Sequence, residues 1–289
     1  MKSILKHIFF KSAVRFFLLI GKILKKDQLL SASSFLGSLL YIFPLKRKYV
    51  AFDNLKIAFG QQYEENELKR LLKRFINEFV LIALEIAFII KRRERLAQWA
   101  KASGVEYLDE ALRKNKGVIA LSAHLGNIPI MLAWLAEKGY PVAVLFKEGK
   151  YLPEGFLYNL IKSYKIYPIP FHSDREVPKE IIKALNQNMI VFILADQARP
   201  GIYAKFFGKY VQCQKGAFVI AKRKGSPIIP AFIIREKDGH KIKIYPGIEI
   251  EKDIQLLIEK YNILLENLIR QYPEQYYWFH RRFKKMKLH

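Results

Sequence analysis

The sequence has little cysteine and few acidic residues, and each shortage limits what the protein can be. Only one of the 289 residues is cysteine, so no internal disulfide can form and the chain fits a reducing compartment. Lys and Arg number 50 against 26 Asp and Glu, which gives a formal net charge of +24. Such a field attracts nucleic acid, an anionic membrane or an acidic carrier protein, and charge alone does not choose among them.

Motifs that bind common cofactors are also missing. The sequence contains no phosphate-binding loop and no glycine fingerprint of a dinucleotide-binding fold. His172, His240 and His280 lack the spacing of metal ligands, and Cys213 has no CxxC partner. We therefore expect an activity without a bound cofactor or metal. No recognisable nucleic-acid-binding motif accompanies the basic charge, so we expect no nucleic acid partner.

Apolar runs long enough to cross a membrane are scarce. Residues 8–20 are rich in Phe, Leu and Ile, but Lys11 and Arg15 interrupt them and no convincing cleavage site follows, so they make a poor secretory signal. Residues 29–43 fall short of the roughly 20 residues that span a bilayer. Neither run predicts a single membrane-spanning helix.

The N-terminal segment nevertheless has the pattern of a membrane-facing helix. Lys11, Arg15 and Lys22 fall on one side of a helix whose other sides carry several Phe and Leu residues. This pattern is typical of a helix in the membrane interface, although an amphipathic helix packed on the domain has it too. We divide the chain into a membrane-associating helical segment, residues 1–50, and an α/β domain, residues 51–289.

The rest of the chain has the pattern of an α/β fold. Apolar residues make up 51% of the sequence, enough to bury a sizeable core, and residues 54–99 show helical periodicity. Strands and helices then alternate, and residues 203–210 are expected to form a Gly-rich, aromatic loop. The expected strands are 117–123, 141–146, 166–170, 189–195, 227–234 and 240–245, and the expected helices are 128–138, 153–165, 177–188, 215–224 and 253–271. The pattern predicts a mixed sheet flanked by helices.

His124 is the leading candidate for catalysis, because it lies where a buried strand ends and a helix begins. Ligands and chemistry collect at such carboxyl ends of strands in open α/β sheets. Asn127 is a suitable N-cap and a candidate for substrate binding, and Pro129 fits the first helical turn. A neutral imidazole here can act as general base toward a hydroxyl that attacks a thioester. A histidine that only satisfies hydrogen bonds at a strand end is the alternative.

The segment His124-Leu-Gly-Asn127 resembles the signature of the lipid A biosynthesis lauroyl/myristoyl acyltransferase family, part of the wider lysophospholipid acyltransferase superfamily. Further family-like blocks follow in the expected order over residues 45–285, namely Val50 to Phe59, Ala195-Asp-Gln197, Phe206-Phe-Gly208, Gly216 to Lys222, Pro230 to Arg235, and Pro273 to Lys284.

This resemblance implies a glycerolipid acyltransferase-like fold and a specific reaction. The expected enzyme transfers a fatty acyl chain from an acyl-carrier-protein or coenzyme A thioester to a hydroxyl of a lipid A precursor or related membrane glycolipid. It would work at the cytoplasmic face of the cell inner membrane, where a basic surface suits anionic lipids and an acidic carrier protein.

Two positions depart from the superfamily pattern. That pattern places Asp or Glu five residues after the histidine, and here Pro129 stands there, which cannot orient an imidazole. The resemblance also implies an Arg soon after the next strand, where the nearest cation is Lys147; lysine keeps the charge but lacks the bidentate fork. A catalytically degenerate, membrane-bound member with an accessory role is therefore the alternative function.

Asp196 is the first candidate to replace the missing acid. It ends the expected strand 189–195, which we expect to lie near the His124 strand, and the resemblance places this Asp in the active region with Gln197 beside it. A capping role for Asp196, with a backbone carbonyl or water orienting His124, is the alternative.

The remaining candidates concern lipid binding. Phe206, Phe207 and Gly208 would line an acyl channel, although adjacent Phe residues are as often simple core. Arg281 and Arg282 follow an aromatic stretch suited to a membrane interface and would bind phosphates of a headgroup. A solvated terminal charge run is the alternative.

Overall fold

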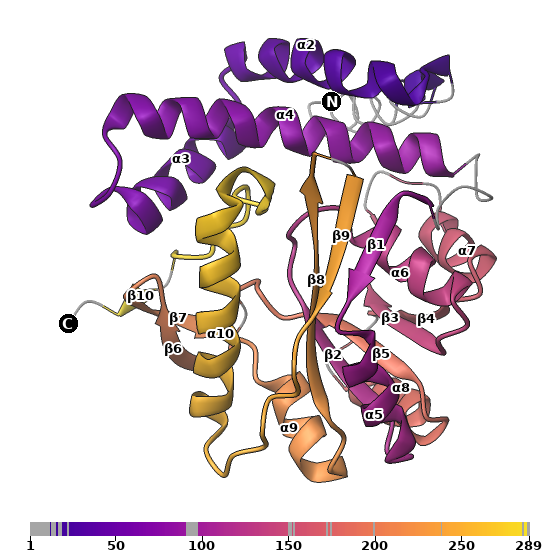
Figure 1. The fold of residues 1–289 in the computed structure, drawn as a ribbon. Helices are drawn as coiled ribbons and strands as arrows, with labels where there is room; N and C mark the ends of the chain where they lie inside the picture. The colour runs from indigo at the N-terminus through magenta and orange to yellow at the C-terminus, as the bar shows by residue number, and fades with distance from the viewer. Residues whose placement is uncertain are drawn as a thin grey trace.

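A seven-stranded mixed sheet forms the centre of the protein (Figure 1). The computed structural model describes residues 12, 16, 19–21, 23–90, 98–149, 152, 154–171, 173, 175–198, 200–237, 239–284 and 286–287. The strand order is β1-β9-β8-β2-β5-β3-β4, and all neighbouring strands are parallel except β8 and β9. These strands are β1 (Ala100–Ser103), β2 (Val118–Ser122), β3 (Val142–Phe146), β4 (Tyr167–Pro170), β5 (Ile190–Leu194), β8 (Ile228–Glu236) and β9 (Gly239–Ile244). The predicted mixed sheet is confirmed.

Helices cover both faces of this sheet, which explains why its central strands are apolar along their whole length. All five residues of β2 are buried, and so are four of the five in β5. Two apolar clusters lie on opposite sides of the sheet, one with α5, α6 and α7 and the other with α8, α9 and α10. These helices are α5 (Val105–Arg113), α6 (Ile128–Glu137), α7 (Phe156–Ser163), α8 (Val177–Asn186), α9 (Gly216–Lys224) and α10 (Ile254–Gln271).

A helical layer from the N-terminal part of the chain closes one end of the sheet (Figure 1). The long helix α4 (Glu65–Ile89) crosses the end at which β8 finishes, and it contributes to both apolar clusters. The strands β2, β5, β3 and β4 run in the same direction as β8, so their carboxyl ends point toward α4. The other elements of the layer are η1 (Lys26–Gln28), α2 (Leu29–Ile42) and α3 (Lys46–Phe59).

Small residues allow α2 to lie directly on α4. Leu29, Ser33 and Gly37 recur every four residues and form the buried side of α2. A Cβ on Gly37 would come within 2.8 Å of the Asn77 Cα, so only glycine permits this approach. Outside this buried side, α2 and the residue that follows it expose large apolar side chains: Leu30, Phe35, Leu39, Ile42 and Phe43.

Within the described ranges, no helix is by itself both long and apolar enough to cross a membrane. One bent pair, Lys26–Ile42 with Lys46–Phe59 at 96°, satisfies length and composition jointly. The basic side predicted from Lys11, Arg15 and Lys22 lies outside the described residues. The helix α3 runs across residue 50, where we place the boundary between the membrane-associating segment and the α/β domain.

Two features of the fold differ from the sequence expectation. Residues 203–210 belong to a hairpin, β6 (Ile202–Phe206) and β7 (Lys209–Cys213), that pairs with β10 (Met286–Lys287) in a small second sheet. The prediction of a loop there was wrong, because only Phe207 and Gly208 form the turn, both with positive φ. The edge strand β1 and the helix α5 were not predicted; β1 has only four residues, too few for a periodicity to show.

Candidate active site

His124 lies in a tight loop between β2 and α6. Gly126 makes this loop possible, since its φ is +65° and an added Cβ would lie 2.2 Å from the Ile233 carbonyl oxygen. The C-terminal segment fixes the loop from the other side. The Gly126 N–H donates to the Gln275 carbonyl at 3.0 Å, and the Tyr277 N–H donates to the His124 carbonyl at 2.9 Å. The backbone that carries the His124 side chain is therefore packed against β8 on one side and hydrogen-bonded to the C-terminal segment on the other.

Asp196 and Gln197 contact the two ring nitrogens of His124. Asp196 follows β5, which pairs in parallel with β2, so both side chains emerge at the same end of the sheet. The His124 Nδ1 lies 2.9 Å from the Asp196 Oδ1, and the His124 Nε2 lies 3.3 Å from the Gln197 Nε2. Asp196 is almost fully buried at 2% exposure, whereas 32% of the His124 side chain remains accessible.

The electrostatics keep the Asp196 carboxyl ionised beside His124. Burial alone would raise the pKa of Asp196, but the charge and hydrogen bond of His124 and the charge of Arg282 lower it below its usual value. Burial would lower the pKa of His124, yet the charge and hydrogen bond of Asp196 outweigh it and raise that pKa. An ionised carboxylate only accepts hydrogen bonds, so a neutral His124 carries its proton on Nδ1 and leaves Nε2 as the basic atom.

A large apolar cavity opens beside this imidazole. Its volume is about 1110 Å³, and His124, Pro129, Lys147 and Gln197 line it together with apolar side chains from α4, α6, α7, α8 and α9. Pockets that take one drug-sized ligand hold roughly 300–1,000 Å³. The site therefore combines one basic nitrogen with a space suited to long hydrocarbon.

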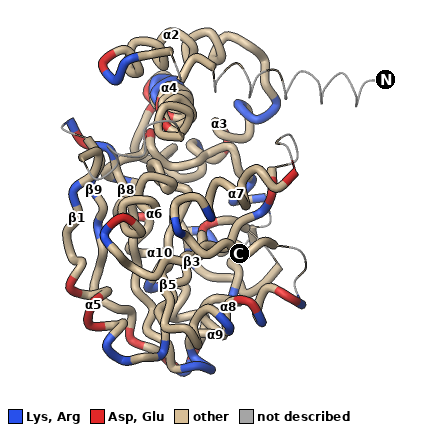
Figure 2. Tube along the Cα trace, turned by 90° about the vertical axis from the view of Figure 1, so that its right-hand side faces the viewer, with Lys and Arg blue, Asp and Glu red and all other residues tan. Residues whose placement is uncertain are grey.

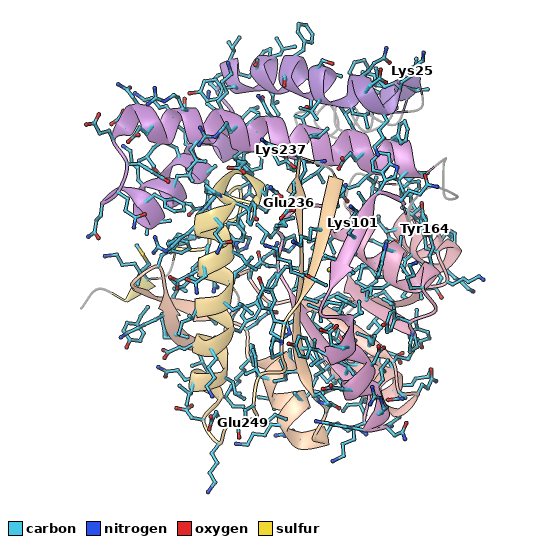
Figure 3. All side chains as sticks on the ribbon, in the orientation of Figure 1. Lys25, Lys101, Tyr164, Glu236, Lys237 and Glu249 are labelled. Atoms are coloured by element: carbon cyan, nitrogen blue, oxygen red, sulfur yellow. The ribbon has the colours of Figure 1, made fainter. Side chains whose placement is uncertain are left out.

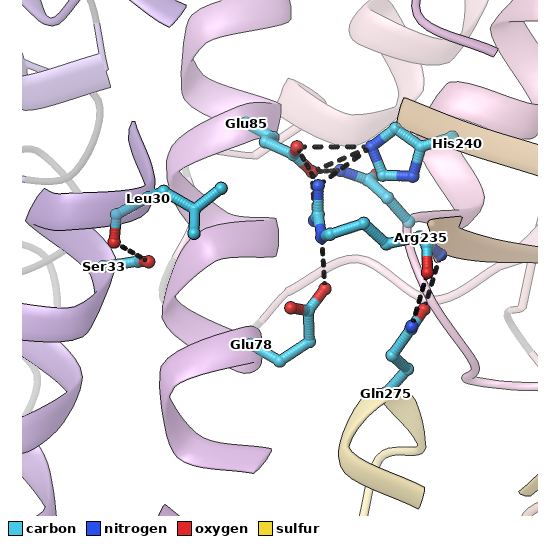
Figure 4. A network of polar contacts seen from close by, with 8 residues as sticks. Leu30, Ser33, Glu78, Glu85, Arg235, His240 and Gln275 are labelled. Carbon is cyan, nitrogen blue, oxygen red and sulfur yellow. Dashed lines mark hydrogen bonds and ion pairs between the residues drawn. The ribbon is translucent and has the colours of Figure 1, made fainter. Parts of the chain in front are cut away.

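A buried ionic network joins α4 to β8 and β9 (Figure 4). The guanidinium of Arg235 donates to Glu85 at 2.5 and 2.8 Å and to Glu78 at 2.7 Å, and the His240 Nε2 lies 3.2 Å from a Glu85 oxygen. Burial would raise the pKa of Glu85, but its bonds with Arg235 and His240 lower it to about 2. Asn127 joins the network by donating to Glu85 at 3.0 Å. The network ties α4 to β8, β9 and the start of α6.

Asn127 differs from its sequence interpretation. It occupies the N-cap position of α6, as predicted, but its side chain does not cap the helix. Because the Asn127 amide is fully buried and bonded to Glu85, it does not face the cavity. The structure thus places the Asn127 side chain in a bond within the protein, and Asn127 is not among the residues that line the cavity.

Arg282 is also not at the surface where a headgroup would meet it. It is only 2% exposed, and its guanidinium donates to the Gln212 carbonyl at 2.8 Å and to the Cys213 sulfur at 3.1 Å. Its charge acts from the interior on Asp196. Arg281, by contrast, is exposed. The two arginines that the sequence suggests as a pair are placed in different environments.

Phe206, Phe207 and Gly208 lie away from the cavity and are not among its lining residues. Phe206 is fully buried, packs edge-on against Phe207 with ring centroids 4.9 Å apart, and lies under the Arg282 guanidinium. Gly208 closes the turn between β6 and β7. The structure therefore places the two rings in the core and the glycine in a turn.

Sequence reasoning missed Glu85, Arg235, Gln275 and Tyr277. Glu85 gives a signal, because it is a single acid inside the apolar stretch of α4, and a buried charge needs a partner. Arg235 is the eighth residue of a nine-residue strand whose first seven residues are buried. Gln275 and Tyr277 give no such signal, since their role is to hold the His124 loop through backbone and amide bonds across the fold.

Among the described residues, no group of three or more His, Cys, Asp or Glu side chains is arranged to hold a metal ion. The geometry instead defines a class of protein: an α/β enzyme with a His–Asp pair at the carboxyl edge of a mixed sheet and a hydrocarbon-sized cavity beside it. Comparison with known proteins agrees with this class and identifies the family.

The chain belongs to the bacterial lipid A biosynthesis acyltransferase family, whose model matches residues 2–285. It is similar to the lipid A biosynthesis lauroyltransferase of Escherichia coli (strain K12), with 22% identity over 262 residues that cover 86% of this chain and 83% of the relative. The palmitoleoyltransferase of the same strain is 24% identical over 268 residues, covering 86% and 82% of the two chains. The myristoyltransferase is 21% identical over 244 residues, covering 82% and 75%. The protein is an acyltransferase of lipid A biosynthesis.

Proposed function

We propose that this enzyme transfers a fatty acyl chain from an acyl-carrier-protein or coenzyme A thioester to a hydroxyl of a lipid A precursor or related glycolipid, with His124 as general base. One observation carries the proposal: His124 lines an apolar cavity of about 1110 Å³ while its Nδ1 contacts the buried Asp196 carboxylate, which leaves Nε2 as the basic atom. This arrangement suits a base that must stay in one tautomer beside a hydrocarbon chain.

The chemistry follows from the orientation of the imidazole. The Nε2 atom of His124 takes the proton of the acceptor hydroxyl as its oxygen attacks the thioester carbonyl. The resulting tetrahedral oxyanion collapses, the carbon–sulfur bond breaks, and the imidazolium returns its proton to the thiolate that leaves. The charge of Asp196 stabilises the imidazolium between these two steps.

Lys147 and Gln197 are our candidates for binding the thioester carbonyl and its oxyanion. Both line the cavity with His124, and the Gln197 amide lies close to Nε2. A cation or amide donor aimed at the developing negative charge stabilises the transition state more than the ground state. Lys147 supplies the charge that the family pattern assigns to an arginine at this place.

The exposed side of α2 supports a location at a membrane surface. Leu30, Phe35 and Ile42 are 63%, 72% and 74% exposed, which is unusual for side chains of this size. Lys46, Arg47 and Lys48 begin α3 directly beyond this apolar side. Apolar side chains flanked by cations suit the interface of an anionic membrane, and we propose the cytoplasmic face of the inner membrane.

The remaining basic residues fit an acidic carrier protein and lipid phosphates. Lys and Arg gather at the beginning of α3 and, at the opposite end of the molecule, at the end of α9 (Figure 2). Arg281, which is exposed, remains a candidate for a headgroup phosphate.

A catalytically degenerate member is the competing function. Its main support is Pro129, and the contact between His124 and Asp196 counts against it because this contact supplies the orienting acid.

The test is acyl transfer by the purified full chain. A radiolabelled acyl thioester and a lipid A precursor in mixed micelles should give an acylated product, which mass spectrometry would identify. His124→Ala should reduce kcat/KM by about 10²–10⁴-fold, the usual contribution of a general base. Lys101→Ala, which changes an exposed side chain on β1, serves as control. Equal rates for His124→Ala and the parent would exclude the proposed base, and no product from the parent would favour the degenerate member.

A further inference from the structure

The cavity reaches both faces of the sheet. In β3, the neighbouring residues Val144 and Leu145 both line it. The last two residues of β5, Ile193 and Leu194, both line it as well. Consecutive side chains of a strand point to opposite faces. Val144 and Leu194 accordingly belong to the apolar cluster of α6 and α7, whereas Leu145 and Ile193 belong to that of α8 and α9. One cavity therefore has two arms around the carboxyl edge of the sheet.

The first arm, here called the α6–α7 arm, lies between those helices and the second half of α4. Ile89, Ile128, Leu132 and Ile161 line it. Tyr164 follows α7 and is labelled in Figure 3. Its hydroxyl donates to the Ile89 carbonyl at 3.3 Å, which joins α7 to the end of α4. The apolar cluster on this face continues into α2, including Leu29. The α6–α7 arm is thus apolar and adjoins the helical layer that we propose lies at the membrane.

The second arm, here called the α8–α9 arm, lies on the other face of the sheet. The apolar residues Phe171, Val177, Ile181, Ala217 and Ile220 line it, and Gln214 and Lys215, which precede α9, also line the cavity. Both arms meet near the residues that follow β2 and β5. His124 and Gln197 stand at that junction and line the same cavity.

We infer that the cavity holds two hydrocarbon chains at once, one in each arm, with their reacting ends meeting at His124. This inference rests on the proposed function and extends it to the division of the substrates. The α8–α9 arm takes the acyl chain of the thioester donor. The α6–α7 arm takes a hydrocarbon chain of the acceptor lipid. This arm is bounded by α4, and α2, which packs on α4, carries the exposed apolar side chains that we propose lie at the membrane.

The volume and the chemistry of the walls support two chains over one. The volume of about 1110 Å³ lies above the roughly 300–1,000 Å³ of pockets that take one drug-sized ligand. A single chain would leave one apolar arm to be filled by water, which has few polar partners there. Two chains that meet at one imidazole also bring an acceptor hydroxyl and a thioester carbonyl together, which is the main entropic requirement of a transfer between two lipids.

The first experiment measures binding and does not depend on turnover. A fluorescent long-chain fatty acid is titrated into the purified full chain, and we expect two molecules bound per chain. Leu132→Phe fills the α6–α7 arm and Ile181→Phe fills the α8–α9 arm, so each should remove one bound molecule. A stoichiometry of one or none in the parent, or the loss of the same site in both variants, would overturn the inference.

The second experiment assigns the arms by steady-state kinetics with donors of graded chain length. Ile181→Phe should lower kcat/KM for the longest accepted donor about tenfold relative to shorter donors, the effect of one or two carbon atoms in an apolar pocket, and leave the acceptor KM unchanged. Leu132→Phe should raise the acceptor KM about tenfold and leave the donor preference unchanged. Effects on the opposite substrate, or both effects on the same one, would refute the assignment.

Matched controls separate these effects from general damage. Ile263→Phe and Leu256→Phe add the same atoms to the exposed side of α10, where the parent side chains are 60% and 43% exposed, and should change neither readout. If the filling variants do not fold, Ile181→Ala and Leu132→Ala widen the arms, and each should favour a longer chain of its own substrate. A parent without acyl transfer would contradict the proposed function, and the binding stoichiometry would still decide on the two arms.

Discussion

Two histidines of this protein contact a buried carboxylate, and their surroundings give them different roles. His124 contacts Asp196 through Nδ1, and the residue lines the cavity. His240 contacts Glu85, but its side chain is 2% exposed and shares that carboxylate with Arg235. A histidine–carboxylate contact alone therefore does not define a catalytic pair. The first pair differs from the second because a substrate can reach its imidazole, and because no Lys or Arg among the described residues forms an ion pair with its carboxylate.

The difference extends to what each pair stabilises. The Glu85 network binds α4 to β8, β9 and the loop before α6, so it maintains the frame around the site. In the pair at the cavity, the second imidazole nitrogen lies 3.3 Å from the neutral amide of Gln197. Variants of the network should therefore change stability more than chemistry, and variants at the cavity should do the reverse.

Arg235→Ala should have the largest effect on stability. It leaves Glu85 and Glu78 as two buried carboxylates without their shared cation, and breaking a buried ionic pair in this way costs about 3–5 kcal/mol of unfolding free energy. Urea denaturation followed by circular dichroism measures the loss. Lys69→Ala removes an exposed pair with Glu65 and is the control; it should leave the midpoint unchanged. Equal stability of Arg235→Ala and the parent would mean that the network does not hold the frame.

Asp196→Asn should lower kcat about a hundredfold, as expected when a base loses the charge that orients it and stabilises its protonated form. The KM for the thioester should change little, because Asp196 lies behind His124 and does not line the cavity. Steady-state kinetics of folded, purified protein provides both values. A rise in KM at constant kcat would instead assign Asp196 to substrate binding.

The pH dependence of kcat/KM should differ between the parent and Asp196→Asn, by a smaller effect that is specific to the His124 pKa. Because Asp196 raises the folded-state pKa of His124 above 6.5, the neutral base forms only as the pH rises through that pKa, and kcat/KM should increase over the same interval. In Asp196→Asn the raising charge is gone while burial still lowers the pKa, so the midpoint should move to lower pH. A midpoint that does not move in the variant would show that another group controls the profile.

The raised pKa of His124 also makes the stability of the folded protein depend on pH. A raised His124 pKa stabilises the folded state fully below the unfolded pKa near 6.5, and this contribution is lost as the pH rises through the folded pKa. Urea midpoints of the parent should therefore fall over that interval relative to those of His124→Ala.

Much of the α/β core could be predicted from the sequence, and the failures have physical causes. The strands β2 and β5 are continuous apolar runs, and the N-cap Asp253 marks the start of α10, where its side chain accepts from the Gln255 N–H. The hairpin at residues 203–210 was misjudged because glycine and aromatic residues suggest both loops and strands. The Asn127 contact depends on Glu85, 42 positions away in the chain, and local patterns carry no information about such a bond.

In the candidate site too, local sequence patterns predict some features, and contacts between distant residues determine the others. His124 and Asp196 could be paired from the sequence, because two parallel strands that both end in polar residues bring those residues to one edge. The inward position of Arg282 could not be inferred, since a basic run near a terminus usually faces solvent. Its burial depends on the small sheet of β6, β7 and β10, whose existence the sequence did not reveal.

Pro129→Glu should have the smallest effect and tests why an acid is absent from that position. Pro129 lines the cavity, and Asp196 already contacts the His124 Nδ1, so a new carboxylate cannot take over the orienting contact. A charge in an apolar cavity is unfavourable, and Pro129→Gln offers a control of the same shape without it. We expect kcat/KM of Pro129→Gln to stay near the parent value and that of Pro129→Glu to be equal or lower. A large gain with Glu and none with Gln would mean that Asp196 orients His124 poorly and that the two histidine–carboxylate pairs are more alike than their access suggests.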